Sequence, residues 1–162
     1  LAELDMFFSS QIKTAFASKA AIAAAVRNAH LVIGAVLVPG AAAPKLVSRA
    51  QLSTMLPGSV LVDVAIDQGG CFETSRATTH QDPIYEVDGV MHYCVANMPG
   101  AVPATSTAAL TNATLPYVLR VAGSGWKKAC SDSRELERSL STSHGKLRNA
   151  DVIAEFPDLP AA

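Results

Sequence analysis

The sequence predicts an α/β fold in which part of a doubly wound parallel sheet is followed by a mainly helical carboxy-terminal segment. Three continuous apolar runs have the length and the closing turn residues of strands covered on both faces, and they lie at 31–38, 60–66 and 90–96. Segments with helical periodicity precede two of these runs. Strands that alternate with helices are typical of a parallel sheet, so the pattern indicates this fold class.

Length and composition restrict the classes of protein. The 162 residues have room for about one domain, and 49% hydrophobic with 17% charged residues is enough to bury a core. A net charge of −1 offers no polycationic surface, so we expect no nucleic-acid partner. No apolar run approaches the ~18 residues of a membrane span. Cys71, Cys94 and Cys130 lack metal-ligand spacing, which predicts no metal site and favours a reducing cytoplasm.

The amino-terminal segment predicts a strand and then a helix. Apolar residues alternate over 12–16, and Ser18 has the position of a helix cap before an alanine-rich run that ends near 29. The chain starts at Leu1 with helix-like residues, which leads us to expect that further residues precede it. Ser48 and Gln51 match a capping box, so a short helix is expected from there to about 56. The stretch between 70 and 90 is predicted as a polar loop.

Beyond residue 103 the pattern becomes helical. A helix is predicted from about 105 to 123, with Pro116 kinking or dividing it. A short helix at 126–131 and another that starts near Asp132, with Glu135 as its capping partner, are expected to follow. Residues 143–145 are predicted to form a turn, and Asn149 to begin a last helical turn.

The three apolar runs end in similar turn chemistry. PGAAAPK follows Val38, DQGG follows Ile66, and NMPGAVP follows Ala96. In open parallel sheets ligands bind outside the carboxyl ends of the strands, and the glycines permit a close backbone approach, so Asp67 and Asn97 would point a carboxylate and an amide at a ligand. The alternative is that these are ordinary turn residues. Asp63, inside the strand, would stabilise only a neighbouring helix end, and Asp67 is the favoured acid/base or hydroxyl acceptor.

Other candidate groups have plainer interpretations. Cys71 follows Gly70 and could be a nucleophile, but no adjacent histidine would activate it and buried structural cysteines are commoner. His80 and His144 lie among loop-forming residues and are expected at the surface. Asn112 matches a glycosylation acceptor by chance within a helix. The sequence contains no GxGxxG, P-loop, HExxH or GxSxG motif.

Four longer sequence segments resemble those of a known family. LVIGAVLVPGAAAPKLVS, VLVDVAIDQGGCFETSR, YCVANMPGAVPATST and LTNATLPYV resemble the carboxy-terminal half of bacterial alanine dehydrogenase, in order and spacing, over nearly the whole chain. The resemblance implies a Rossmann-like NAD-binding domain whose second part spans 1–102, and a helical segment at 103–162 that returns to the substrate domain. The α subunit of proton-translocating transhydrogenase shares the PG-x-x-AP-K-L loop but differs at the DQGG and NMPG segments.

This resemblance implies an activity and a set of site residues. Alanine dehydrogenases interconvert L-alanine with pyruvate and ammonia, with NAD as cofactor, and are typically homohexamers. Asp67 matches the family's active-site aspartate, which helps to order the substrate and a catalytic water. The remaining positions that would contact NAD are Val36, Leu37, Val38, Ile66, Val95, Asn97 and Met98. The sequence departs from the family at Ala43, Ala77 and Ala104, where Lys, Pro and a basic residue are common.

Several groups that the family needs are missing from this sequence. The glycine-rich fingerprint, the acidic residue for the adenosine ribose, and the catalytic Lys, His and Arg would all lie before Leu1. We therefore expect these 162 residues alone not to turn over alanine. Half of a doubly wound sheet would also expose an apolar surface and promote association into oligomers. Two alternatives stay open, a non-catalytic nucleotide-binding or assembly module and a transhydrogenase-like subunit.

Overall fold

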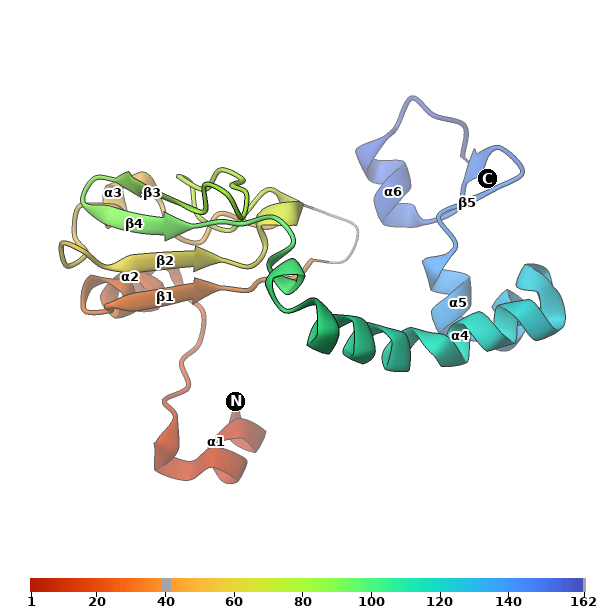
Figure 1. Cartoon of the computed structure of the whole chain (residues 1–162), viewed down its shortest axis with the longest axis horizontal. Helices are drawn as coiled ribbons and strands as arrows, with labels where there is room; N and C mark the ends of the chain where they lie inside the picture. Colours follow the sequence, from red (N-terminus) through yellow and green to blue (C-terminus); the bar gives the residue numbers. More distant parts are fainter. Residues whose placement is uncertain (39–41, 162) are drawn as a thin grey trace. The chain divides into compact units, whose positions relative to one another are not determined.

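The computed structural model describes residues 1–38 and 42–161, and these form two compact units. The first unit consists of Leu1–Leu37 and Ala42–Ala96, and the second is built on Asn97–Ala162 together with Val38. Figure 1 shows the elements of each, coloured along the sequence. Each unit is described by itself.

The first unit contains a four-stranded mixed sheet in the order β1-β2-β4-β3. β1 (Leu31–Gly34), β2 (Val60–Asp63) and β4 (Val90–Tyr93) are parallel, so their carboxyl ends lie at one edge. β3 (Ile84–Val87) pairs antiparallel with β4 (Figure 1). The α/β class and the parallel arrangement of the three apolar runs are confirmed.

β3 was expected as part of a polar loop, and that expectation is wrong. The sequence IYEV-DG-VMHY forms a hairpin in which Asp88 and Gly89 have φ angles of 52° and 81°. Two consecutive left-handed residues make the turn that matches the twist of antiparallel strands, and Asp-Gly is its strongest short signal. The hairpin was therefore readable from the Asp-Gly pair.

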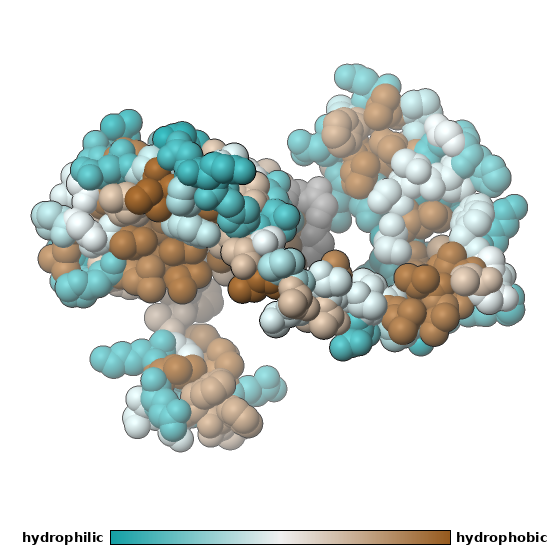
Figure 2. Space-filling view, in the orientation of Figure 1, coloured by the Kyte–Doolittle hydropathy of each residue, from teal (hydrophilic) through white to brown (hydrophobic). Residues whose placement is uncertain are grey.

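The parallel strands are shorter than predicted, and β1 is covered on one face rather than two. β2 ends at Asp63 because this side chain accepts a hydrogen bond from the Ala65 backbone N–H at 3.1 Å and begins a turn. The short 3₁₀ helix η2 (Ile66–Gln68) follows. On β1, Leu31 and Ile33 remain 54% and 61% exposed, because no described element packs over them. Figure 2 shows this apolar surface over β1 and β2.

The amino-terminal strand expected at 12–16 is absent, because no described strand lies beside it to complete a ladder. The chain instead forms α1 (Ala2–Phe8) and the 3₁₀ turn η1 (Ser9–Gln11), followed by irregular backbone. α2 (Lys19–Arg27) begins as predicted, with the Ser18 hydroxyl accepting from the Ala21 N–H at 3.1 Å.

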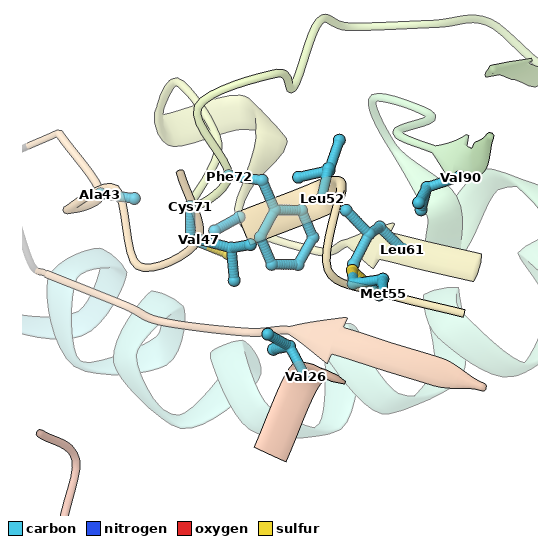
Figure 3. Close-up of a cluster of buried hydrophobic side chains, with 10 residues drawn as sticks. Val26, Ala43, Val47, Leu52, Met55, Leu61, Cys71, Phe72 and Val90 are labelled. Atoms are coloured by element: carbon cyan, nitrogen blue, oxygen red, sulfur yellow. The ribbon is translucent and has the colours of Figure 1, made fainter. Parts of the chain in front are cut away.

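The core of the first unit lies between the sheet, α2 and α3 (Arg49–Leu52). The predicted capping box is present, since the Ser48 N–H donates to the Gln51 side chain at 2.7 Å. Phe72, which follows the loop after β2, is 1% exposed at the centre of this cluster (Figure 3). The other buried members are Val26, Ala43, Val47, Leu52, Met55, Leu61, Ala65, Cys71 and Val90.

The second unit is mainly helical, as predicted. The 3₁₀ turn η3 (Met98–Ala101) leads into α4 (Pro103–Asp132). The helix is not divided at Pro116; it is broken at Gly125, whose φ of 75° and ψ of 154° no α-helix accommodates. Thus the predicted helix to about 123 and the short helix after it are both present. None of the helices in the described ranges is long and apolar enough to cross a membrane.

Short capped elements complete the second unit. α5 (Arg134–Ser139) is capped by Ser133, one residue later than expected, and Glu135 accepts from the Ser133 hydroxyl at 2.7 Å. β5 (Thr142–Ser143) and β6 (Lys146–Leu147) form a hairpin around the predicted turn, with positive φ at both of its central residues. α6 (Ala150–Glu155) starts at the predicted Asn149 cap.

Gly34 is required by close packing, which gives a test of the fold. A Cβ at this position would lie 2.1 Å from the Cys71 sulfur and 2.7 Å from a ring carbon of Phe72, both buried. We expect Gly34→Ala to lower the free energy of unfolding by about 1–3 kcal/mol or more, as overpacked cores do. Chemical denaturation measures it.

The same substitution at Gly123 is the matched control. Beyond the neighbouring backbone of α4, no atom of the described residues lies within 4 Å of a Cβ at Gly123, which has an ordinary helical φ. Gly123→Ala should therefore be neutral or stabilising by up to ~1 kcal/mol. Equal stability of Gly34→Ala and the parent chain would contradict the described packing of Cys71 and Phe72 on β1.

Candidate functional site

The loop after β2 is organised by a buried carboxylate. Asp63 is fully buried, and its Oδ1 accepts from the Ala65 N–H at 3.1 Å. Its Oδ2 accepts from the backbone N–H groups of Cys71 and Phe72 at 2.9 and 3.4 Å. The Ser75 hydroxyl donates to the same oxygen. One side chain therefore joins the start of the loop to its end.

These donors explain why a carboxylate is stable at this depth. Burying an unpaired charge is costly, whereas a carboxylate that accepts several N–H and O–H bonds retains much of the solvation that it had in water. Gly70, with φ of 75°, lies against this group, and a Cβ there would be 2.7 Å from Asp63 Oδ2. The Asp63 carboxylate is thus bonded mainly to backbone N–H groups, and position 70 beside it accommodates only glycine.

The other side of the loop is held by the segment that follows β1. The Lys45 ammonium donates to the carbonyls of Gly69 and Gly70 at 2.5 and 2.7 Å. The Ala43 N–H donates to the Gln68 carbonyl at 2.9 Å, and the Leu46 N–H to the Cys71 carbonyl at 2.7 Å. Four hydrogen bonds therefore fix the carbonyls of Gln68 to Cys71 from outside the sheet.

Asp67 differs from Asp63 in every respect that matters for a ligand. It lies in η2 at the carboxyl edge of the parallel strands, and it is exposed. Its carboxylate has no hydrogen bond or ion pair to any residue that the structure describes. At Gly69, φ is 86°, and apart from its chain neighbours no atom of the described residues lies within 4 Å of a Cβ position, so the backbone is also open there. A ligand can reach both groups.

The same edge carries other residues singled out by the sequence. Leu37, after β1, is 72% exposed and offers an apolar contact, while Val36 is half-buried. The side chains of Ile66 and Val95 are 8% and 0% exposed and belong to the packed interior. Val95 bridges to Thr78, so the end of β4 is tied to the loop before β3. The first unit thus brings five of the candidate residues to one edge.

Val38, Asn97 and Met98 belong to the second unit. Asn97 has a left-handed backbone with φ of 63° and precedes η3, in which Met98 is half-buried. A groove of about 580 Å³ lies next to Asn97, between η3 and the first turns of α4. It is lined by Asn97, Pro99, Gly100, Pro103, Ser106 and Leu110, among others. Residues 39–41 of the predicted PGAAAPK loop lie outside the described residues.

Sequence reasoning missed a second buried network beside the loop. His92 is fully buried on β4, with Nδ1 3.0 Å from the Val90 carbonyl and Nε2 2.7 Å from the Thr74 hydroxyl. Since a carbonyl only accepts, Nδ1 carries the proton and Nε2 accepts from Thr74. Burial lowers the pKa of His92. The Thr74–His92 bond and the Ser75–Asp63 bond together fix the chain after Phe72 to β4 and β2.

Tyr85 completes this network. Its ring stacks on His92 at a centroid distance of 4.8 Å and lies under the Arg76 guanidinium at 4.0 Å. The Tyr85 hydroxyl donates to the Thr74 carbonyl and accepts from the Arg76 N–H, both at 2.9 Å. Burial raises the pKa of Tyr85. Tyr85 is on the unpredicted strand β3, so only recognition of the Asp-Gly hairpin would have led to it.

The remaining candidates have structural positions. Cys71 is fully buried, and burial together with the nearby Asp63 charge raises the pKa of its thiol to about 11, the opposite of an activated nucleophile. His80 and His144 are exposed in loops, as expected. Within the described ranges, no three side chains with metal-ligating groups lie together.

Comparison with known proteins gives a consistent result. Residues 1–150 match the family model described as "Alanine dehydrogenase/PNT, C-terminal domain". The chain is 59% identical to alanine dehydrogenase of Halomonas elongata over 156 residues, which is 96% of this chain and 42% of that protein. A solved structure of L-alanine dehydrogenase superimposes with a TM-score of 0.81 at 48% identity, over 97% of this chain and 43% of that one.

A transhydrogenase is a more distant neighbour. The crystal structure of transhydrogenase from Sinorhizobium meliloti gives a TM-score of 0.57 at 33% identity, over 66% of this chain and 30% of that one. This chain thus spans about two fifths of the length of the alanine dehydrogenases that it matches.

The buried thiols provide a direct test of the site geometry. Cys71 and Cys94 are both 0% exposed, whereas Cys130 is partly exposed and its thiol is 3.5 Å from the Leu136 carbonyl. We expect one fast-reacting thiol per native chain with a water-soluble disulfide reagent at pH 8, and three after denaturation. Cys130→Ser should remove the fast phase. Fast labelling of Cys71 in the native chain would show that the loop is open.

The His92 network predicts a pH dependence of stability. The folded pKa lies below the ordinary value of 6.5, so the unfolded chain takes up a proton first as the pH falls. The stability contributed by neutral His92 is complete above about pH 6.5 and is lost below it. Urea midpoints at pH 7.5 and 5.5 should therefore differ more in the parent chain than in His92→Gln. The exposed His144 is the control, and a difference lost in His144→Gln but kept in His92→Gln would refute the assignment.

Proposed function

Because this chain belongs to the alanine dehydrogenase/PNT C-terminal domain family, we propose that it forms the carboxy-terminal part of an NAD-dependent alanine dehydrogenase. The overall reaction is L-alanine + NAD⁺ + H₂O to pyruvate + NH₄⁺ + NADH + H⁺, and its reverse. The observation that carries the proposal is the Asp67 carboxylate, held without a partner among the described residues at the carboxyl edge of a parallel sheet.

The residues at this edge fit a nicotinamide nucleotide. Asp67 can accept hydrogen bonds from ribose hydroxyls or from a water, the open backbone at Gly69 admits a flat ligand, and the exposed Leu37 offers an apolar surface. When bound, NAD accepts the hydride from the substrate α-carbon. Asp67 would orient the substrate and the water that hydrolyses the resulting imine. Ile66 and Val95 have buried side chains, so their contribution would come from backbone atoms and from packing.

The remaining positions are assigned by family likeness. Val38, Asn97 and Met98 would contact the same cofactor, supported by the left-handed Asn97 and the groove beside it. We assign residues 1–102 to the second part of the NAD-binding domain and 103–162 to the segment that returns to the substrate domain. The start of α4 at Pro103 supports that division, whereas the compact unit that contains α4 already begins at Asn97.

The proposal includes the assembly and location of the whole protein. The exposed Leu31 and Ile33 on β1, and Leu110, Val118 and Leu119 on α4, supply apolar surface for a homo-oligomer, a hexamer by family likeness. Three free cysteines, two of them buried, suit a reducing cytoplasm.

Two other functions are weaker. A transhydrogenase-like subunit is disfavoured because that structure matches less of the chain at lower identity. A non-catalytic binding module would keep the sheet and lose the reaction, and it predicts that Asp67 has no kinetic role.

A chimera provides the test of activity. The 162 residues alone should not form NADH from L-alanine and NAD, because family likeness assigns the groups that bind the substrate carboxylate and accept protons from the amine to the amino-terminal part of the enzyme. Replacing the matching segment of the Halomonas elongata enzyme with this chain should give an active dehydrogenase. Steady turnover by the isolated chain, or a folded chimera that binds NAD without turnover, would contradict the proposal.

Within that chimera, Asp67→Asn should lower kcat by about 10²-fold or more, since it removes the carboxylate that orders the substrate and water. Asp82→Asn is the matched control, because Asp82 is exposed in the same unit and its carboxylate has no hydrogen-bond or ion-pair partner in the described residues. Equal kcat values for the two variants would remove Asp67 from the site.

A further inference from the structure

Lys45 is a surface lysine with unusual hydrogen-bond partners. Lys45 is exposed, yet its ammonium donates hydrogen bonds to two successive backbone carbonyls, those of Gly69 and Gly70, at 2.5 and 2.7 Å. It has no carboxylate partner among the described residues. A surface lysine whose ammonium bonds only to backbone carbonyls loses side-chain entropy and gains no ion pair. We therefore look for its role in fixing the position of that backbone.

The two carbonyls lie directly after the turn that carries Asp67. Residues Ile66–Gln68 form η2, and Gly69 and Gly70 both have left-handed φ angles, at 86° and 75°. Glycines have the widest choice of backbone conformations, so this pair would move readily if nothing held it. Lys45 bonds to the carbonyls of this flexible pair.

Asp63 holds the same loop from the opposite side. It accepts from the N–H groups of Ala65 and Cys71, which bracket the Asp67 turn. The Gly70 carbonyl and the Cys71 N–H belong to one peptide unit, so Lys45 and Asp63 act on opposite ends of that peptide dipole, and the two bonds reinforce each other. We call this arrangement the loop clamp, made of Lys45 and Asp63.

We propose that Lys45 is a positioning residue for the reaction: by holding the Gly69 and Gly70 carbonyls against Asp63 it fixes where the Asp67 carboxylate meets the cofactor and substrate. This inference rests on the proposed function. Displacement of a reacting group by about 1 Å can reduce a rate by about 10²-fold, so loss of the lysine should be visible in kcat.

Lys45 is the better residue for the experiment because its side chain is at the surface, whereas Asp63 is fully buried. Lys45→Met keeps the length of the side chain and removes the donors, and Lys45→Arg keeps donors for both carbonyls. Lys19→Met is the matched control, since Lys19 lies at the start of α2 and its ammonium makes no hydrogen bond or ion pair with any described residue. Asp63→Asn tests the other half of the clamp, but it disturbs a fully buried site.

The first measurement is amide hydrogen exchange on the 162-residue chain itself. Lys45→Met should speed exchange at Gly69, Gly70 and Cys71, whose N–H groups bond to Ile66, Ala65 and Asp63, and leave the β2 amides unchanged. Lys45→Arg and Lys19→Met should match the parent chain. Unchanged exchange in Lys45→Met would overturn the clamp, whatever the function of the protein.

The second measurement is a double-mutant cycle in the chimera. We expect Lys45→Met to lower kcat by about 10-fold to 10²-fold with little change in KM for NAD, Lys45→Arg to restore most of the rate, and Lys45→Met to have no further effect in an Asp67→Asn background. Additive losses, or a raised KM for NAD at unchanged kcat, would show that Lys45 does not act through Asp67. A parent chimera without activity would refute the proposed function, and the exchange result would then decide the clamp alone.

Discussion

The buried carboxylate of Asp63 is the interaction on which the candidate site depends. An ionised side chain at zero exposure is stable only if its oxygens are fully bonded, and here the donors are supplied by the loop that it organises. The loop therefore cannot be remodelled without leaving a buried charge unsatisfied. Gly34 and Gly70 are small for the same reason, because the loop packs directly on β1 and on Asp63.

Two aspartates four residues apart thus have opposite roles. The Asp63 carboxylate is hydrogen-bonded within the fold, whereas Asp67 is exposed and its carboxylate has no hydrogen-bond or ion-pair partner among the described residues. The fold uses the first carboxylate to hold the second at the edge where parallel strands end, which is where α/β sheets bind ligands. Lys45 and the His92–Thr74 bond restrain the rest of the same loop from its outer side and from β4.

Sequence patterns predicted the elements that depend on local chemistry. The caps at Ser18 and Asn149 follow from side-chain hydrogen bonds within a few residues, and the pattern placed them correctly. The prediction of a strand at 12–16 was wrong because alternating apolar residues show which face would be buried but do not provide a neighbouring strand to pair with. The role of Asp63 was only partly visible, since its partners at Cys71, Phe72 and Ser75 come from a loop whose path depends on packing against Gly34. The His92–Tyr85 stack was missed for another reason: the two residues are paired across the β3–β4 hairpin, whose Asp88-Gly89 turn was not recognised.

The most direct test of the role of Asp67 is a crystal structure of the Halomonas elongata chimera with NAD and L-alanine. We expect an Asp67 oxygen to lie within about 2.6–3.2 Å of a cofactor ribose hydroxyl, the substrate or a water between them, and Asp63 to keep its bonds to the loop. NAD bound away from this edge, with Asp67 in contact with solvent or protein alone, would contradict it.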